Sequence, residues 1–353
     1  MPTMRRLFYE QARDGAPPMS TSSSSFSSSR ASSEALGAVP PRPPGGVEGR
    51  VTLRVAQWNI NCLCGIDCRS AQAASDILEV LGPLEADVLL IQEAPQGPPN
   101  EWWPEPWKSA FPTQAMRDLE SGLKDLGYNV QLRTHCANST LLCSKLPLEA
   151  ATPSASLDDD HSFRGSMKEE RAALLAHLRL PAGANSADSP LVACYATHLH
   201  HDNMVPGWGG VREAEVTALL RHWQAHASPK ARCGILATDF NQSRRGDYSA
   251  KDWSLIAEAL GKPWVRQPED DGVADLLRGA GWRCAFDAPA AARNWPSRPP
   301  STGAPPVSHW TGTVVDYPYV VDHQGFVEVL GVYLVYSPLS DHLPIVTDLS
   351  ISI

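Results

Sequence analysis

The sequence has no uninterrupted apolar run approaching the ~18 residues of a membrane-spanning helix, which excludes an integral helical membrane protein. It also has no excess of positive charge, because 30 Lys and Arg stand against 39 Asp and Glu, a formal net charge of -9. That balance excludes a protein that coats nucleic acid by charge alone. It does not exclude an enzyme that holds a polyanion through metal cations, since the cations supply the missing positive charge.

The sequence otherwise has the composition of a globular protein, with 42% hydrophobic and 20% charged residues. Its 353 residues would allow two domains of average size. No linker-like stretch divides residues 51–353, however, so we expect one domain over residues 49–353.

Residues 1–48 differ in composition from the remainder. Ten Ser lie between Ser20 and Ser33, and a Pro-rich stretch follows at 40–46. Residues 1–50 carry six Arg and four acids, a net charge of +2, whereas the rest carries 24 basic and 35 acidic groups, a net charge of -11. Such a segment has too little apolar surface to offset the entropy of ordering it, which predicts a disordered leader.

The leader is open to two interpretations. An Arg- and Ser-rich, acid-poor segment is typical of an organelle transit peptide, but an untargeted tail has the same composition. A secretory signal is not indicated, because no apolar stretch of about 7–15 residues follows the early arginines. We therefore expect an intracellular protein, located in a mitochondrion or plastid if the leader targets it, and otherwise in the cytoplasm or nucleus.

The eight cysteines do not indicate a disulfide framework in a chain of this length. Cys194 and Cys233 lie inside apolar runs, which predicts buried free thiols in a reducing compartment. Cys62, Cys64 and Cys68 are close enough in sequence to suggest thiolate metal ligands, but a matching second Cys or His pair for zinc is missing.

Apolar periodicity predicts strands and helices that intermix without a strict βαβ rhythm. This favours α/β layers with mixed or antiparallel sheets. Residues 95–113, rich in Trp and Pro, are predicted as a long loop. The predicted strands cover 51–60, 87–93, 141–144, 171–180, 191–198, 234–240, 313–321, 327–336 and 343–353, and the predicted helices cover 71–81, 118–126, 213–225 and 253–260.

Polar residues follow hydrophobic runs at the ends of five predicted segments. One acid or His at a strand end is usually an exposed charge or a structural residue. Together they supply carboxylates, carboxamides and two imidazoles, the groups that a divalent-cation site for phosphoryl hydrolysis needs. Strand ends gathered at one sheet edge are a rigid place to fix such groups. The segments are 57–61, 90–93, 196–199, 237–241 and 340–345.

Six short motifs stand in one order along the chain: WNIN (58–61), QE (92–93), THL (197–199), DFN (239–241), VVDY (314–317) and SDHLPI (340–345). In these motifs the chain resembles the endonuclease/exonuclease/phosphatase superfamily, which includes DNase I, exonuclease III-type enzymes and several lipid and inositol phosphoesterases. The resemblance covers residues 51–353. It implies a four-layered α/β sandwich, with two mainly antiparallel sheets packed face to face and helices outside.

The resemblance also implies a metal cofactor, Mg²⁺, with Mn²⁺ as a substitute. Glu93 and Asp341 would be metal or water-shell ligands, because Mg²⁺ favours oxygen donors. Asn59 and Asn61 would help to hold the metal's water shell or a phosphate oxygen.

By the same resemblance, Asp239 would orient or deprotonate the attacking water, and Asn241 would donate to the phosphoryl oxygens. His342 would sit against the scissile phosphate with Asp316 on its other ring nitrogen, which favours the imidazolium. His198 would stabilise the charged transition state.

The chain departs from the family pattern at two places. Thr238 precedes Asp239 where the family usually has Gly, so the local turn was expected to differ slightly. His200, His201 and Asp202 follow the THL motif, and they are either a second metal site or solvated loop residues.

Substrate choice in the family depends on loops, and the loops of this chain are individual. Arg244 and Trp310 are predicted substrate neighbours because they are close in sequence to the DFN and VVDY motifs. A loop with Trp102, Trp103 and Trp107 would stack unpaired bases, pack on the protein body or meet a lipid surface.

The resemblance favours a phosphodiesterase of nucleic acid, a nuclease or end-processing enzyme. The alternatives are a phosphatase or phospholipase C-type hydrolase of lipid or small phosphate esters, and a catalytically silent binding protein. The last would lack one of the metal or phosphate residues, and none is missing from the motifs.

Overall fold

The computed structural model describes residues 41–43, 49–63, 73–94, 113–134, 139–149, 155–156, 172–181, 190–200, 210–254, 272–290, 308–309, 313–322 and 324–353. The strands are β1 (Arg50–Asn59), β2 (Val88–Ala94), β3 (Val130–Arg133), β4 (Ser139–Ser144), β5 (Ala155–Ser156), β6 (Ala172–Arg179), β7 (Leu191–His198), β8 (Cys233–Asp239), β9 (Arg283–Cys284), β10 (Asp316–Asp322), β11 (Val327–Leu334) and β12 (Ile345–Ser352). The α-helices are α2 (Ala74–Leu81), α3 (Thr113–Asp125), α4 (Val211–His222) and α6 (Gly272–Gly279). A π-helical turn, Trp223–Ala227, extends α4, and short 3-10 turns cover Asn61–Leu63, Gly82–Leu84, Arg245–Asp247 and Ala285–Asp287.

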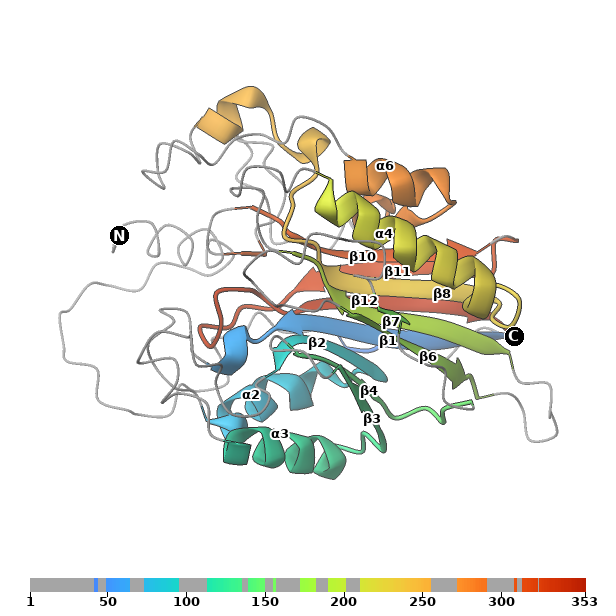
Figure 1. The fold of residues 1–353 in the computed structure, drawn as a ribbon. Helices are drawn as coiled ribbons and strands as arrows, with labels where there is room; N and C mark the ends of the chain where they lie inside the picture. The colour runs from blue at the N-terminus through green and yellow to red at the C-terminus, as the bar shows by residue number, and fades with distance from the viewer. Residues whose placement is uncertain are drawn as a thin grey trace.

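The strands form two six-stranded sheets, in the orders β11-β12-β1-β2-β4-β3 and β5-β6-β7-β8-β10-β9. Most strand pairs are antiparallel, and each sheet contains one described parallel pair, β1 with β2 and β7 with β8. Helices α2 and α3 lie outside the first sheet, and α4 and α6 lie outside the second (Figure 1). The predicted four-layered α/β sandwich is confirmed.

The central strand β1 shows why both faces of the first sheet are apolar. Leu53 and Val55 belong to the core between the two sheets. Ala56 and Trp58 belong to a second cluster that packs against α2 and α3. Since successive side chains of a strand point to opposite faces, β1 contributes to both cores, as expected for a strand covered on both sides.

The first helical layer departs from the sequence prediction. Helix α3 begins at Thr113, whereas the sequence predicted a helix from 118 and a loop up to 113. Met116, Leu119 and Leu123 are buried, and their helical spacing supplies the apolar face. The short segments β3 and α6 were not predicted from the sequence.

The buried cysteines agree with the sequence prediction. Cys194 and Cys233 lie in β7 and β8, and both are buried free thiols. Burial raises the pKa of the Cys233 thiol to about 12, which keeps it protonated and unreactive.

Several predicted features lie outside the described residues. They include the leader (1–40 and 44–48), whose disorder, boundary and targeting stay predictions, and residues Cys64, Cys68, Trp102, Trp103, Trp107, His201, Asp202 and Trp310. Across the part of the chain that the structure describes, no helix is long and apolar enough to cross a bilayer.

Candidate active site

One row of the second sheet carries three of the predicted site residues. His198, at the end of β7, pairs in register with Asp239, at the end of β8. Asp239 in turn pairs with Asp316, the first residue of β10. Residues paired in register point to the same face of a sheet, so adjacent strands place an imidazole and two carboxylates side by side at one edge.

The first sheet reaches this row through Asn59, the last residue of β1. The Asn59 carboxamide Nδ2 donates to Asp239 Oδ2 at 3.0 Å and lies 3.1 Å from Glu93 Oε1 as a second acceptor. Gln57, two residues earlier on the same face, donates to the main-chain oxygen of Thr238 at 3.3 Å. The carboxamides of β1 therefore join the two sheets at the end of the sandwich where the site lies.

Glu93 lies near the end of β2 with a backbone that breaks the strand's alternation. Its φ is +52°, and the pairing of β2 with β4 shifts register between Ile91 and Ala94. Strict alternation would place Glu93 on the same face as Leu89 and Ile91, which pack toward α2 and α3. The left-handed residue instead brings the carboxylate to Asn59, and its side chain keeps an exposed fraction of 22%.

Left-handed backbone recurs around the site. Among the described residues other than glycine, positive φ occurs at Asn61, Glu93 and Asn241, which belong to the motif segments, at Cys62 and Leu63, which follow the first motif, and at Glu85 elsewhere. A non-glycine residue in this conformation costs on the order of 1 kcal/mol. Such strain gathers where surrounding structure holds a functional group in place.

Asn241 holds the turn after β8 against His198. Its main-chain N–H donates to Asp239 Oδ1 at 2.7 Å, and its side-chain Nδ2 lies 2.8 Å from His198 Nε2. The same Nδ2 donates to the main-chain oxygen of Leu199 at 2.9 Å. His198 Nε2 is also 3.4 Å from Asp239 Oδ2 and 3.7 Å from Glu93 Oε1, so this imidazole faces both carboxylates.

His342 forms a hydrogen-bonded chain with Asp316 and Ser308. Its Nδ1 lies 2.9 Å from Asp316 Oδ2, and the buried Ser308 hydroxyl donates to the same oxygen at 2.7 Å. The indole of Trp58 donates to the main-chain oxygen of His342 at 3.0 Å. With Nδ1 committed to Asp316, ring nitrogen Nε2 is directed to Asp239, whose Oδ2 is 3.7 Å away.

Charge within this buried cluster moves the pKa values in different directions. Burial opposes the imidazolium of His342, but Asp316 and Asp239 outweigh it and raise the His342 pKa well above its ordinary value. Burial also opposes the Asp239 carboxylate, yet His342 and His198 lower the Asp239 pKa. For Asp316, burial and the nearby Asp239 charge prevail, and the Asp316 pKa is raised.

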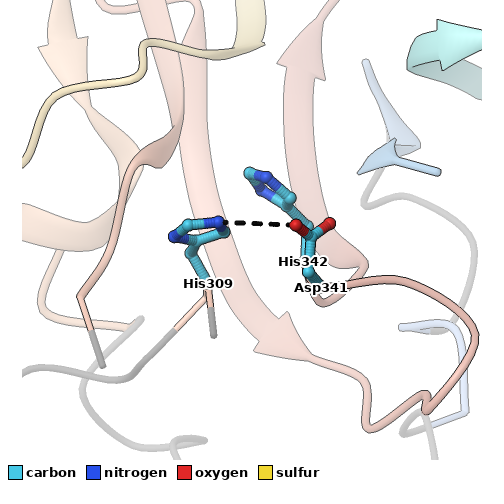
Figure 2. Close-up of side chains that lie close together, drawn as sticks. All are labelled: His309, Asp341 and His342. Atoms are coloured by element: carbon cyan, nitrogen blue, oxygen red, sulfur yellow. Dashed lines mark ion pairs between the residues drawn. The ribbon is translucent and has the colours of Figure 1, made fainter. Parts of the chain in front are cut away.

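Asp341 and His309 complete the site on the His342 side. Figure 2 shows the Asp341 carboxylate directed at the His309 ring, with a distance of 3.8 Å from Asp341 Oδ2 to His309 Nε2. The rings of His309 and His342 lie 4.3 Å apart between centroids. His309 was not predicted as a site residue from the sequence. It immediately precedes Trp310, which was predicted as a substrate neighbour because it is close in sequence to the VVDY motif.

Helix α4 contacts the loops that follow β7 and β8, which was not predicted from the sequence. Buried Arg212 donates from Nη1 to the main-chain oxygen of Asn241 at 2.6 Å. One turn later, Glu215 accepts a hydrogen bond from the main-chain N–H of His200 at 3.2 Å and contacts the His200 ring. His200 therefore contacts a buried carboxylate, and the second metal site considered from sequence stays a prediction because its other members are not described.

Two predicted residues have other neighbours. The Arg244 guanidinium is bound to Asp247, with a shortest distance of 2.6 Å, and to Asp287 at 2.7 Å. It is not brought together with the catalytic row, and its role in substrate binding stays a prediction. The Asn61 N–H donates to Asn59 Oδ1 at 2.9 Å, so Asn61 fixes the carboxamide that bridges the sheets.

The structure also places Thr238, a departure from the family pattern, and Cys62, one of the three clustered cysteines. Thr238, which was expected to alter a turn, is a buried residue inside the regular pairing of β7, β8 and β10. Cys62 lies beside Glu93, with 3.8 Å between its Sγ and Glu93 Oε2.

The carboxylates around Asn59 are the type of ligand that a hard divalent cation takes, but neither group of potential metal ligands found among the described residues includes Glu93, so its metal role stays a prediction. Glu93 and Asp239 share the Asn59 carboxamide, and Glu93 is partly exposed to solvent. Carboxylate oxygens are the ligands that Mg²⁺ prefers. The third carboxylate, Asp341, has a lowered pKa despite burial, because His309 and His342 favour its charged form.

No model of a sequence family and no curated protein sequence matches the chain. Solved structures do. An endonuclease/exonuclease/phosphatase from Beutenbergia cavernae DSM 12333 aligns with a TM-score of 0.56 and 17% identity, over 85% of this chain and 72% of that one. The human Nocturnin catalytic domain with bound sulfate aligns with a TM-score of 0.54 and 17% identity, over 85% and 94%.

A third solved structure, ANGEL2, described as a 2',3'-cyclic phosphatase in complex with adenosine-2',3'-vanadate, aligns with a TM-score of 0.55 and 15% identity, over 87% of this chain and 98% of that one. At such identities the likeness concerns the fold. The resemblance predicted from the six motifs is confirmed at that level: the chain has the fold of the endonuclease/exonuclease/phosphatase proteins.

Proposed function

We propose that the protein is a divalent-metal-dependent phosphoesterase that hydrolyses phosphodiester bonds, with nucleic acid as the favoured substrate. One observation carries the proposal. Asn59 Nδ2, His198 Nε2 and His342 Nε2 all lie within 3.7 Å of a single buried oxygen, Asp239 Oδ2. Three segments distant in sequence thus converge on the carboxylate of a fourth segment, at the end of the sandwich.

Asp239 is the group that would orient or deprotonate the attacking water. Its lowered pKa keeps it charged at neutral pH, and the Asn241 N–H on Oδ1 fixes the plane of the carboxylate. A base held in position needs no reorganisation when the water arrives.

His342 and His198 would act on the phosphate. Asp316 holds the His342 ring from Nδ1, which leaves an Nε2–H to donate to a phosphoryl oxygen or to the leaving oxygen. Asn241 would donate to the phosphoryl oxygens, and His198 would stabilise the charged transition state. Cationic and carboxamide donors aimed at developing negative charge stabilise a pentacoordinate phosphoryl transition state.

Glu93, with Asp341 and the Asn59 carboxamide, would hold the metal ion, for which Mg²⁺ is proposed and Mn²⁺ is a substitute. When bound, such an ion lowers the pKa of water and neutralises phosphate charge. It would also offset the net charge of -11 that residues 51–353 carry, calculated as 24 basic minus 35 acidic groups.

Two comparisons support a phosphate ester as the substrate. The Nocturnin structure contains a sulfate anion, and ANGEL2 is described as a 2',3'-cyclic phosphatase bound to an adenosine vanadate. Nucleoside phosphodiesters are therefore the first substrates to test for this chain.

The test is a parallel assay of single-stranded RNA, single-stranded DNA, nucleoside 2',3'-cyclic phosphates, sphingomyelin and small phosphate monoesters with Mg²⁺. We expect hydrolysis of a nucleic-acid substrate, its loss with EDTA, its return with added Mg²⁺ or Mn²⁺, and its absence in Glu93→Ala. Turnover confined to sphingomyelin or to monoesters would replace the proposed substrate with a lipid or small phosphate ester. Full turnover in excess EDTA would contradict metal dependence.

A further inference from the structure

Three side chains beside the proposed catalytic row can ligate a metal. One ligand atom from each of His309, Asp341 and His342 lies within 4.8 Å of the others. Figure 2 shows the carboxylate and the His309 ring facing one another, with the His342 ring adjacent. The other such group among the described residues, Asp239, Asp316 and His342, is closed by the hydrogen bond between His342 and Asp316.

The spacing of His309 and Asp341 suits a shared cation. Their Nε2 and Oδ2 atoms are 3.8 Å apart. This is longer than a direct hydrogen bond, which ends at about 3.2 Å. It is shorter than the sum of two metal–ligand bonds, about 4.2 Å for Zn²⁺ with imidazole and carboxylate. One cation can therefore contact both atoms without displacing either side chain.

The environment of His342 matches that of a metal-bound histidine. Its Nδ1 is held by Asp316, which is itself held by the Ser308 hydroxyl. Ligating imidazoles commonly donate their second nitrogen to a carboxylate in this way, which fixes the ring and strengthens the other nitrogen as a ligand. Nε2, which lies 3.7 Å from Asp239 Oδ2, is the nitrogen through which His342 would take a cation, and it must give up its proton to do so.

The chemistry of the three donors differs from that of Glu93. Two imidazoles and one carboxylate suit Zn²⁺ and related transition ions, whereas Mg²⁺ favours oxygen donors alone. Three protein ligands also leave a fourth tetrahedral position for water. Asp341 is common to this group and to the proposed Mg²⁺ ligands, so the donors that differ select the ion: nitrogen from His309 and His342 on one side, and oxygen from Glu93 on the other.

We propose that His309, Asp341 and His342 form a second cation site that binds Zn²⁺ and, by occupying the Nε2 atom of His342, inhibits hydrolysis. The binding part depends only on these three residues. The inhibition part rests on the proposed function, because it requires His342 to contact the phosphate during turnover.

Calorimetric titration of Zn²⁺ into the full chain in saturating Mg²⁺ tests the site directly. We expect binding of one Zn²⁺ to this site, weakened at least about tenfold in His309→Gln. His226→Gln is the matched control, because His222 and His226 form another histidine pair, with ring centroids 4.6 Å apart. Unchanged affinity in His309→Gln, or loss of this binding in His226→Gln, would overturn the proposal.

A second measurement separates this proposal from the function. With the substrate found in the parallel assay, Zn²⁺ should inhibit wild type at concentrations at least about tenfold below those that inhibit His309→Gln. Equal inhibition of both proteins would contradict the inhibitory role. If no substrate is hydrolysed, the proposed function fails while the calorimetric result still decides whether the cation site exists.

Discussion

Two buried ionic clusters in this fold have different compositions. In the first sheet, Arg54 donates to both carboxylate oxygens of Asp348, from Nε at 2.7 Å and from Nη2 at 2.8 Å. Both side chains are almost completely buried, and one positive charge meets one negative charge. At the end of the sandwich, Asp239 and Asp316 both lie beside the imidazole of His342, and the imidazole of His198 also faces Asp239.

From this difference we expect the Arg54–Asp348 pair to stabilise the fold and the Asp239–Asp316–His342 cluster to take part in the chemistry. In the Arg54–Asp348 pair each carboxylate oxygen has a hydrogen-bond donor. At the site, by contrast, Asp316 Oδ1 is buried without a hydrogen-bond partner among the described residues, and the two carboxylate pKa values move in opposite directions. Breaking a buried pair of this kind is destabilising, whereas a cluster of buried titratable groups with shifted pKa values is typical of a functional site.

The largest effect on turnover is expected for Asp239→Ala. Removing the carboxylate on which Asn59, His198 and His342 converge should reduce hydrolysis to background, with the melting temperature and circular dichroism retained. Steady-state rates should be compared with those of Asp275→Ala, an exposed carboxylate on α6. Near-normal turnover by purified Asp239→Ala would refute the assigned role.

His342→Ala should slow hydrolysis by about two to four orders of magnitude, as expected for loss of a general acid or a cationic donor. The rate of the chemical step should fall more than the affinity for substrate, which single-turnover kinetics can separate. A variant that keeps its rate but binds substrate weakly would assign His342 to binding alone.

Asp348→Ala should affect stability and leave the chemistry intact. Breaking a buried pair leaves the Arg54 charge without its carboxylate, at a cost of about 3–5 kcal/mol in the free energy of unfolding. Urea unfolding would measure this loss. Replacing both residues, with Arg54→Met and Asp348→Leu, should recover part of it, and a double variant as unstable as the single one would contradict the pairwise explanation.

The smallest effect concerns His222, whose ring Nδ1 lies 2.9 Å from the Tyr195 hydroxyl. Burial, with His226 and His177 nearby, lowers the His222 pKa from 6.5 to about 4. The folded state therefore binds fewer protons than the unfolded state, and His222 makes stability fall as the pH drops from 6.5 to about 4. Urea unfolding at several pH values should show a weaker dependence in His222→Gln, and an unchanged slope would exclude this contribution.

Much of the site could be predicted from the sequence because its residues end hydrophobic strands. His198, Asp239 and Asp316 follow or begin apolar runs, and regular pairing alone aligns them once the strands are neighbours. Glu93 was selected for the same reason. Its carboxylate reaches Asn59 only because of a left-handed residue beside a bulge, and local sequence does not predict that feature.

For other residues, closeness in sequence to a motif did not indicate which side chains lie at the site. Arg244 follows the DFN motif by only a few residues, but its guanidinium is bound to Asp247 and Asp287. His309 was not selected, although it lies against Asp341 and His342. A long side chain can turn toward whichever partner the fold provides, so sequence position does not fix its contacts.

The amino-acid sequence by itself determined the class of the fold, the segments that carry the chemistry and the residue types gathered there, because hydrophobic alternation and strand-end polarity are local properties. Only the tertiary structure decided on which face of the sheet Glu93 lies and which imidazole lies beside which carboxylate. It alone also placed α4 against the loops that follow β7 and β8. Those outcomes depend on pairing between strands from distant parts of the chain and on electrostatic fields that sum over all of them.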